Sequence, residues 1–194
     1  MQSSDDPKSK MRVLVGMTGA SGALYAKRLL QELATLSVET HLIMSSYAKQ
    51  VVDAELPDGL ELPPGVVNHQ TKSMQIPFAS GSNPPDAMVI VPCSMGSMAR
   101  IAHGTSEDAM LRCADVVLKE RRQLLLVVRE TPLNLIQLRN MVAITEAGGT
   151  IMPASPHFYN QPDSLNALAD TVVARILDHI GLDHDLGVRW AQES

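Results

Sequence analysis

The sequence predicts an α/β fold, in which one open parallel β-sheet carries helices on both faces. Short aliphatic runs alternate with stretches of helical periodicity along most of the chain. The run Leu124–Val128 is entirely aliphatic, as expected of a strand that is buried on both faces of a parallel sheet. Small polar residues directly follow several of the strands, which is typical of the end of such a sheet where ligands bind.

The composition fits one domain with an aliphatic core. The chain has 194 residues, of which 45% are hydrophobic and 3% aromatic, and it contains 11 methionines, which fill irregular gaps in cores. We expect residues 1–10 to form a disordered polar leader and residues 11–194 to form a single domain.

Charge and cysteine content argue against several classes of protein. The net charge of −5 is unlike that of a general nucleic-acid-binding protein. No apolar run approaches the roughly 20 residues that cross a bilayer, so we expect no membrane span. The two cysteines, Cys93 and Cys113, provide neither a metal site nor a disulfide framework. We therefore expect a cytoplasmic protein that holds no metal.

The first strand and the turn after it are the centre of the predicted site. Arg12–Gly16 predicts a buried strand, Met17–Gly22 a turn of small residues, and Ala23–Leu36 a helix. Glycines let the backbone approach an anion closely, and the start of a helix offers unpaired N–H groups to it. The spacing of the three glycines departs from G-x-G-x-x-G, so an ordinary tight turn is the alternative.

The next strand and helix are predicted over Val38–Met44 and Ser46–Glu55, with Ser45 or Ser46 as the N-cap. Dinucleotide-binding enzymes usually have an acidic residue at the end of the second strand, where it binds the ribose. Ser45 stands at that place here, which argues against a nicotinamide cofactor.

A long loop and a third strand follow. Leu56–Pro85 is rich in Pro, Gly and Ser, and a loop of this length is usually functional or flexible. Ala87–Val91 predicts a buried strand, and Pro92–Ser97 again places small polar side chains at the start of a helix. A capped helix that binds no ligand is the alternative at this point.

The second half of the chain continues the alternation. Arg129 and Glu130 directly follow a predicted strand, where such a pair favours a role in ligand binding over a structural ion pair. The elements predicted here are helices over 95–103, 106–120, 133–148 and 163–180 and strands over 123–128 and 150–152. A loop over 153–162 and a tail with Arg189 and Trp190 complete the chain.

The polar residues at the strand ends favour a phosphorylated, largely planar ligand. A second anion site could be formed by Lys119, Arg129, Tyr159 and Arg175. Lys119 could equally be a solvated charge on its helix. Neither Cys93 nor Ser21 has an evident base. The residues therefore indicate positioning and charge stabilisation, as in a reaction from which a phosphate leaves.

Five stretches together resemble the UbiX-type flavin prenyltransferases: VGMTGASGALYAKRLLQEL, THLIMS, VIVPCSMGSMARIAHG, LRCADVVLKERRQLLLVVRETPLNLIQLRNM and IMPASPHFY. The resemblance implies a flavodoxin- or Rossmann-like three-layer domain that assembles into a homododecamer. It also implies an enzyme that binds reduced FMN and dimethylallyl phosphate, joins the prenyl group to N5 and C6 of the flavin, and releases phosphate without a metal. The prenylated FMN would then serve a UbiD-type decarboxylase, as in ubiquinone synthesis or aromatic-acid breakdown.

The same resemblance assigns roles to residues. FMN would contact Gly19, Ala20, Ser21, Ser45, Ser94, Met95, Gly96, Ser97, Arg112 and Arg129. The phosphate of the prenyl donor would contact Lys119, Arg129, Tyr159 and Arg175, of which Lys119 and Arg175 also count as catalytic. Glu55 and Glu130 are the candidates for proton handling.

Three residues and one longer segment depart from the family's pattern. Gly96 and Ser97 stand where the family usually has Lys and Thr, and Gln123 stands for Pro. The segment 56–85 differs in length and sequence. Two alternatives follow. One is a flavin-dependent decarboxylase of peptidyl or pantothenoyl cysteine, for which His69 could serve as the active-site histidine. The other is a flavin carrier without turnover, which Gly96 would favour.

Overall fold

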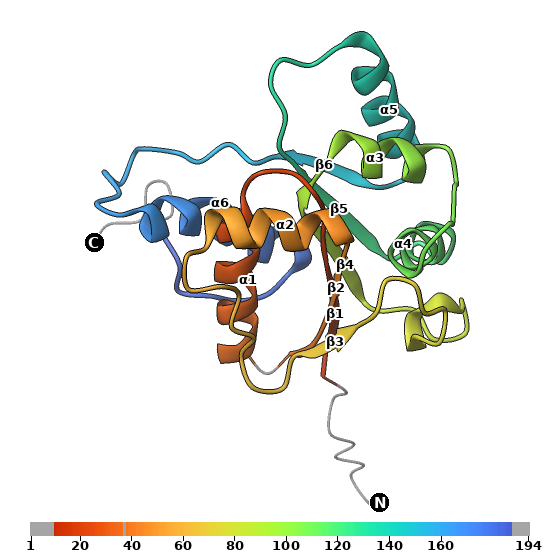
Figure 1. The fold of residues 1–194 in the computed structure, drawn as a ribbon, viewed down its shortest axis with the longest axis horizontal. Helices are drawn as coiled ribbons and strands as arrows, with labels where there is room; N and C mark the ends of the chain where they lie inside the picture. The colour runs from red at the N-terminus through yellow and green to blue at the C-terminus, as the bar shows by residue number, and fades with distance from the viewer. Residues whose placement is uncertain (1–9, 37, 188–194) are drawn as a thin grey trace, which may run out of the picture.

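Six parallel strands form one sheet in the order β3-β2-β1-β4-β5-β6 (Figure 1). The computed structural model describes residues 10–36 and 38–187. The tail residues Arg189 and Trp190, and the predicted leader apart from Lys10, lie outside this part. The strands are β1 (Arg12–Met17), β2 (Glu39–Met44), β3 (Val67–His69), β4 (Ala87–Cys93), β5 (Gln123–Val128) and β6 (Thr150–Pro153).

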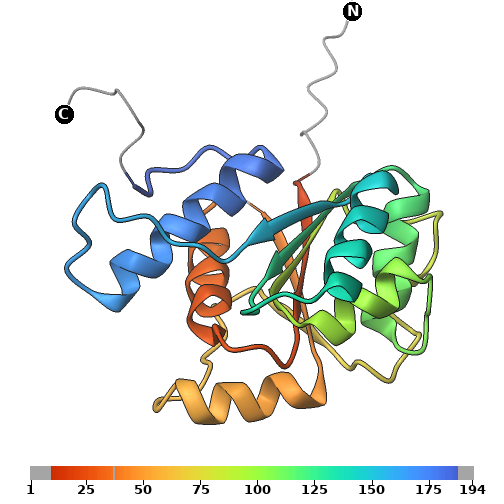
Figure 2. The ribbon, with the colours of Figure 1, turned by 90° about the horizontal axis from the view of Figure 1, so that it is seen from above.

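Helices cover both faces of this sheet, as Figure 2 shows from above. One layer contains α1 (Ala23–Thr35), α2 (Ser46–Glu55) and α6 (Leu165–Ile180). The other contains α3 (Met95–Ala102), α4 (Ala109–Lys119) and α5 (Leu135–Glu146). The predicted three-layer α/β fold is therefore confirmed. Within the described residues, no helix combines the length and the apolar character needed to cross a membrane.

The central strands divide their side chains between two apolar cores. Val13 and Val15 of β1 pack in the core beneath α1 and α6, whereas Leu14 packs in the core beneath α3 and α4. Successive residues of a strand point to opposite faces, so one aliphatic run supplies both cores. Among the described buried hydrophobic residues Phe78 is the single aromatic one, which agrees with the predicted aliphatic and Met-rich interior.

The direction in which successive strands are added reverses beside β1. β1 pairs with β2 on one side and with β4 on the other, whereas the remaining strands extend the sheet outward in each direction. In doubly wound sheets, ligands bind in the crevice that this reversal opens at the carboxyl ends of the strands. The carboxyl ends of β1 and β4 are thus where a site is expected.

The structure corrects the prediction of an uninterrupted loop over 56–85. The short strand β3 pairs with His41–Ile43 of β2, and a 3-10 turn over Pro77–Ala79 inserts the buried Phe78 into the core. β3 is three residues long and lies at the edge of the sheet, so it has no extended aliphatic run for a sequence pattern to detect.

Capping residues set two helix starts later than predicted. Asp108 accepts a hydrogen bond from the N–H of Leu111, so α4 begins at Ala109 rather than at Ser106. Asn134 and Gln137 form a reciprocal capping box, so α5 begins at Leu135 rather than at Leu133.

Candidate active site

Thr18 ties the ends of β1 and β4 together at the reversal point. Its Oγ1 donates to the carbonyl oxygen of Pro92 at 2.8 Å and accepts from the N–H of Ser94 at 2.7 Å. Its own N–H also donates to Pro92 O, at 3.2 Å. Thr18 is only 1% exposed. One buried hydroxyl therefore fixes the turn after β1 against the start of α3.

The turn after β1 needs glycine at two positions for different reasons. A Cβ on Gly19 would lie 2.5 Å from Cβ of Tyr47, so α2 packs directly on the backbone of the turn. Gly22 has a φ of 120°, which other residues adopt only with strain. Ala20 and Ser21 lie between them, and Ser21 is exposed. The turn is therefore tightly constrained around an exposed serine.

Glu55 occupies the N-terminus of α1. Its Oε2 accepts hydrogen bonds from the N–H groups of Gly22 and Ala23, both at 2.8 Å. Gly22 itself offers no capping side chain. The sequence predicted that these N–H groups would be open to a phosphate, and this is wrong because a carboxylate from the end of α2 already caps them.

The same contacts determine the charge of Glu55. Burial would raise the pKa of its carboxyl group. Hydrogen bonds from the Ser21 side chain and from the N–H groups of Gly22 and Ala23 act against burial, as does the charge of Arg129. The net result is a pKa below the ordinary value. Glu55 is therefore a fixed carboxylate at neutral pH.

A cavity of about 210 Å³ lies beside this carboxylate, between α1 and α6. Its polar lining comes from Ser21, Tyr25, Glu55 and Arg129, and its apolar lining from Leu24, Leu165, Leu168 and Ala169, with Gly22 completing it. Burial raises the pKa of Tyr25, with the charge of Arg129 lowering it and that of Glu55 raising it. The cavity thus joins a charged end to an apolar end.

Two further helices begin at the same edge of the sheet with serine caps. Ser45 accepts from the N–H of Ala48 at 3.1 Å, and Ser94 accepts from the N–H of Ser97 at 3.4 Å. The first-turn N–H groups and the dipole of α2 and α3 favour an anion at this edge. A Cβ on Gly96 would meet nothing within 4 Å, so α3 offers open space at that position.

Arg129 and Glu130 follow β5 at the same edge. The N–H of Arg129 donates to the carbonyl oxygen of Cys93 at 3.3 Å, and Glu130 accepts from the N–H of Thr131 at 3.0 Å. In the described part of the chain the Arg129 guanidinium forms no ion pair, so the alternative of a structural pair with Glu130 is not observed. Both side chains are exposed.

The cysteines do not act as nucleophiles. Both Cys93 and Cys113 are buried and unpaired, and burial raises the pKa of each thiol to about 12. They are therefore protonated at neutral pH. No group of three potential ligands within residues 10–36 and 38–187 could hold a metal ion.

Lys119 and Arg112 lie outside the cavity. Lys119 is the last residue of α4, which runs antiparallel to the strands. It therefore lies near the amino-terminal end of β5, whereas Arg129 directly follows the carboxyl-terminal end of that strand. The Nζ atom of Lys119 contacts Glu120. Arg112 donates from Nε to Ala79 O at 3.0 Å and pairs with Asp115 at 2.7 Å. One copy of the chain therefore does not unite Lys119 with Arg129.

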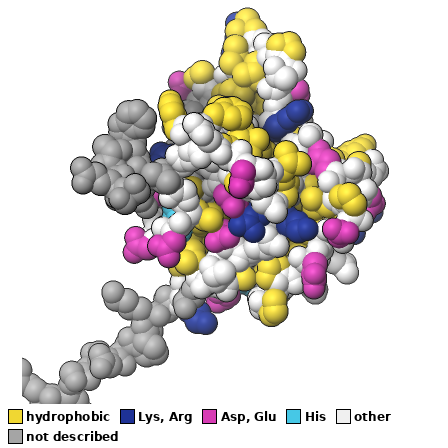
Figure 3. All heavy atoms as spheres, turned by 90° about the vertical axis from the view of Figure 1, so that its left-hand side faces the viewer, with side chains coloured by type: hydrophobic (Ala, Val, Ile, Leu, Met, Phe, Trp, Pro, Cys, Tyr) yellow, Lys and Arg dark blue, Asp and Glu magenta, His cyan; other side chains and the backbone are white. Residues whose placement is uncertain are grey.

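Tyr159 and Arg175 also lie outside the cavity lining. Tyr159 is 78% exposed in the loop after β6, where its ring centroid lies 5.7 Å from that of His157. The Arg175 side chain is 65% exposed on α6 and pairs with Asp178 at 2.6 Å. Figure 3 shows the face that includes this part of the molecule, where acidic and basic side chains lie side by side rather than in patches of one sign.

His69, the histidine considered for a decarboxylase, is engaged elsewhere. Its Nε2 lies 2.8 Å from Nδ1 of His41, and the two rings stack with centroids 5.1 Å apart. His41 in turn contacts Glu39 at 2.8 Å. These residues form a chain along the β2–β3 pair and leave His69 no evident catalytic partner in the described cavity.

Thr18 and Tyr25 are site residues that the sequence did not reveal. Thr18 lies within the predicted turn, but its role depends on Pro92 and Ser94, more than seventy residues away. Tyr25 belongs to the third position of α1, where its spacing from Gly22 could have indicated that it faces the turn.

Comparison with known proteins gives a consistent result. Residues 1–179 match the model of the Flavoprotein family. The chain is 45% identical over 194 residues to a flavin prenyltransferase UbiX of Deinococcus radiodurans, covering 98% of both chains. It is 42% identical to a UbiX of Methanocaldococcus jannaschii over 93% of this chain and 98% of that one.

Solved structures resemble most of the chain. A UbiX crystallised with FMN and dimethylallyl pyrophosphate superposes with a TM-score of 0.88 at 42% identity, covering 95% of this chain and all of that one. A dodecameric FMN-dependent UbiX-like decarboxylase of Escherichia coli O157:H7 gives 0.87 at 41% identity, covering 94% and 100%. A PPC decarboxylase mutant complexed with pantothenoylaminoethenethiol gives a TM-score of 0.63 at 19% identity, covering 88% of this chain and 99% of that one, and shares the fold alone.

Proposed function

The chain belongs to the Flavoprotein family and, within it, to the UbiX-type flavin prenyltransferases, and from this premise we propose how its residues serve the reaction. The enzyme prenylates FMN for a UbiD-type decarboxylase. We propose that it transfers the dimethylallyl group from dimethylallyl phosphate to N5 and C6 of reduced FMN. The main observation behind these residue assignments is that Ser21, Glu55 and Arg129 line one cavity beside the β1–β4 crevice.

The crevice suits FMN in its donor chemistry. The serine-capped starts of α2 and α3 favour a phosphate, whereas the start of α1 is already capped by the carboxylate of Glu55. Reduced FMN supplies the two atoms, N5 and C6, that become prenylated. We assign its binding to Gly19, Ala20, Ser21, Ser45, Ser94, Met95, Gly96, Ser97, Arg112 and Arg129.

Positive side chains would bind and stabilise the departing phosphate. Cleavage of the C–O bond of the prenyl donor builds negative charge on the phosphate oxygens. Arg129 is a fixed cation at the edge of the cavity, and Lys119, Tyr159 and Arg175 provide further donors. Donors placed where charge develops stabilise the transition state more than the ground state, so these residues act on rate.

The two glutamates have different tasks. Glu55 is held as a carboxylate by three donors, so it serves to orient the Ser21 hydroxyl and to balance Arg129. Glu130 is exposed and accepts one described hydrogen bond, from its neighbour Thr131. We assign to Glu130 the transfer of a proton between flavin C6 and the leaving phosphate.

The complete site would draw on more than one copy of the chain. Lys119 and Arg129 lie at opposite ends of β5, so a phosphate that contacts both has to lie between subunits. α5 supports assembly because several of its large apolar side chains are exposed, including Leu135 at 60% and Ile136 at 69%. A dodecamer like that of the E. coli relative is our proposal, as is a cytoplasmic location.

Anaerobic incubation tests the activity. Purified protein is mixed with reduced FMN and either dimethylallyl phosphate or the diphosphate, and the flavin is followed by mass spectrometry and absorbance. We expect the flavin to gain the mass of the prenyl unit with at least one donor. Binding of FMN without any change in its mass under both conditions would instead favour a carrier protein.

A further inference from the structure

We propose that Asp178 and His184 are positioning residues, which hold the Arg175 guanidinium ready for the phosphate of the prenyl donor. The proposal rests on the function proposed above for Arg175. Asp178 Oδ2 pairs with Arg175 Nη1 at 2.6 Å, and Asp178 Oδ1 lies 3.2 Å from His184 Nε2. One carboxylate thus bridges an exposed arginine and a buried histidine, whose side chain is 4% exposed.

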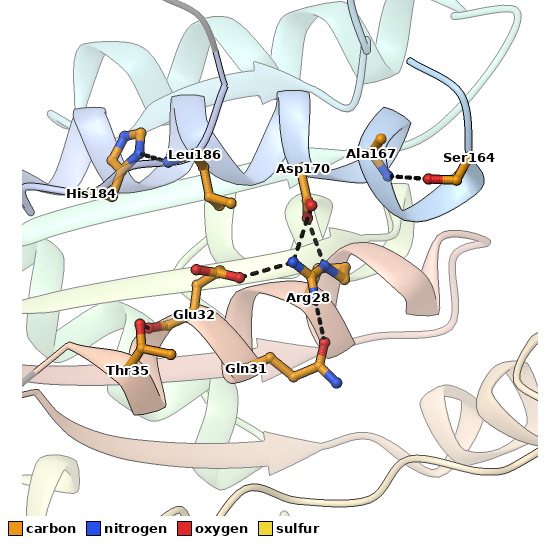
Figure 4. Close-up of polar contacts among 9 residues, drawn as sticks. All are labelled: Arg28, Gln31, Glu32, Thr35, Ser164, Ala167, Asp170, His184 and Leu186. Carbon is orange, nitrogen blue, oxygen red and sulfur yellow. Dashed lines mark hydrogen bonds and ion pairs between the residues drawn. The ribbon is translucent and has the colours of Figure 1, made fainter.

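The hydrogen bonds fix the tautomer of His184. Its Nδ1 accepts from the N–H of Leu186 at 3.1 Å, so Nδ1 carries no proton. The proton of the neutral ring is then on Nε2, which donates to Asp178. Figure 4 shows His184 joined to Leu186 beside the end of α6. Asp178 therefore receives a directed donor from the protein interior.

The way α6 ends brings His184 into contact with Asp178. Gly181 adopts a φ of 78° and terminates the helix, and the N–H of Leu182 returns to Leu177 O at 3.0 Å. Leu182 and Leu186 then pack against the main core beneath α1 and α6. The segment that carries His184 is thus anchored on both sides of the histidine, which makes it a rigid support.

A rigid support matters because Arg175 is long and exposed. An arginine on a surface loses rotamer freedom when it binds an anion, and this loss weakens binding. Asp178 uses only Nη1 of the guanidinium, so the other N–H donors remain for phosphate oxygens. Both oxygens of Asp178 act as acceptors, a role that an amide cannot fill because one of its two polar atoms is a donor.

Asp178→Asn is the direct test because it keeps the shape of the side chain. We expect KM for dimethylallyl phosphate to rise roughly 3- to 10-fold while FMN affinity and the melting temperature stay nearly unchanged. Asp170→Asn is the matched control. Asp170 lies on the same helix and pairs with Arg28 of α1 at 2.6 Å (Figure 4), whereas Arg175 pairs with Asp178. This control should lower the melting temperature without raising KM.

Double variants separate positioning from a structural role. The double variant Arg175→Ala/Asp178→Asn should have the same KM as Arg175→Ala alone. His184→Phe should raise KM as a single variant, but it should leave KM unchanged when Arg175 is already alanine. An unchanged KM in Asp178→Asn, or a further rise in the Arg175→Ala background, would overturn the proposal. If Arg175→Ala alone leaves KM and kcat unchanged, the role proposed for Arg175 fails instead.

Discussion

Glu55 and Glu130 are the same residue type at the same edge of the sheet, but their surroundings differ. Glu55 is fixed by Gly22 and Ala23, whereas Glu130 is exposed and touches the N–H of Thr131. A carboxylate that is bound by several donors is a weaker base than one in water. The role of each glutamate therefore follows from its contacts rather than from its type.

The first prediction concerns Glu130. Glu130→Gln should bind FMN and the prenyl donor normally, but turnover should fall roughly 10²- to 10⁴-fold, the usual contribution of a general acid or base. Single-turnover kinetics with reduced FMN checks this. Glu61→Gln, at an exposed loop position, is the matched control and should be fully active. Native turnover in Glu130→Gln would remove Glu130 from the mechanism.

Gly96 gives a second prediction at this scale. The structure leaves open space at this helical position, so a side chain fits without moving a neighbour. Gly96→Ala should raise the free energy of unfolding by about 0.5–1 kcal/mol, because glycine is a poor helix former. Gly96→Lys should also tighten FMN binding through added positive charge. Urea unfolding and flavin titration check the two effects, and weaker FMN binding by the lysine variant would contradict the second.

Among the elements, α1 depends on α2 for its start. The carboxylate at the end of α2 replaces the side-chain cap that α1 lacks, so the two helices are joined across the turn after β1. Glu55→Gln keeps the shape of this cap and removes its charge. The variant therefore isolates the electrostatic part of the contact.

The third prediction follows with a defined pH dependence. The pKa of Glu55 is lower in the folded chain than the ordinary value of 4.5, so its charge stabilises the fold above that value. This stabilisation is lost as the pH falls through the folded pKa. Urea unfolding should show Glu55→Gln to be less stable than the wild type at pH 7, and the difference should narrow as the pH falls below 4.5. A difference that does not narrow on acidification would show that charge is not the cause.

The sequence predicted most elements but not all of them. Long aliphatic runs such as Leu124–Val128 and the serine cap at Ser45 are local signals, and the structure bears them out. β3 has no such run because it is a short edge strand. The contact of Glu55 with Gly22 joins residues 33 positions apart, so only a family pattern could suggest that Glu55 belongs to the site.

For the whole molecule, the position of Lys119 is the main lesson about prediction. The KERR motif identifies this lysine in the sequence, and the strand predicted over 123–128 lies between it and Arg129, yet the resemblance assigns both residues to one phosphate site. β5 lies between the two residues, so they are at opposite ends of this strand. A resemblance can assign such residues to one site, whereas the topology decides how many copies are needed to build it.

The fourth prediction tests shared sites directly. Lys119→Ala and Glu130→Gln should each be nearly inactive alone. If a site takes these residues from different copies, dissociating and reassembling the two variants together should restore part of the turnover. Sedimentation before and after mixing verifies reassembly, and Ile136→Asp on the exposed face of α5 should reduce the size of the assembly. A mixture that reassembles and stays inactive would place both residues in one copy.

The carboxylate at the start of α1 also gives the crevice a direction. The starts of α2 and α3 attract an anion, whereas the start of α1 already holds one and repels another. A ligand with a phosphate at one end and an uncharged ring system at the other should therefore bind with its phosphate toward the starts of α2 and α3 and its ring system toward the start of α1. Reversed binding would bring two negative groups together, so we expect the chain to favour one orientation before any catalytic residue acts.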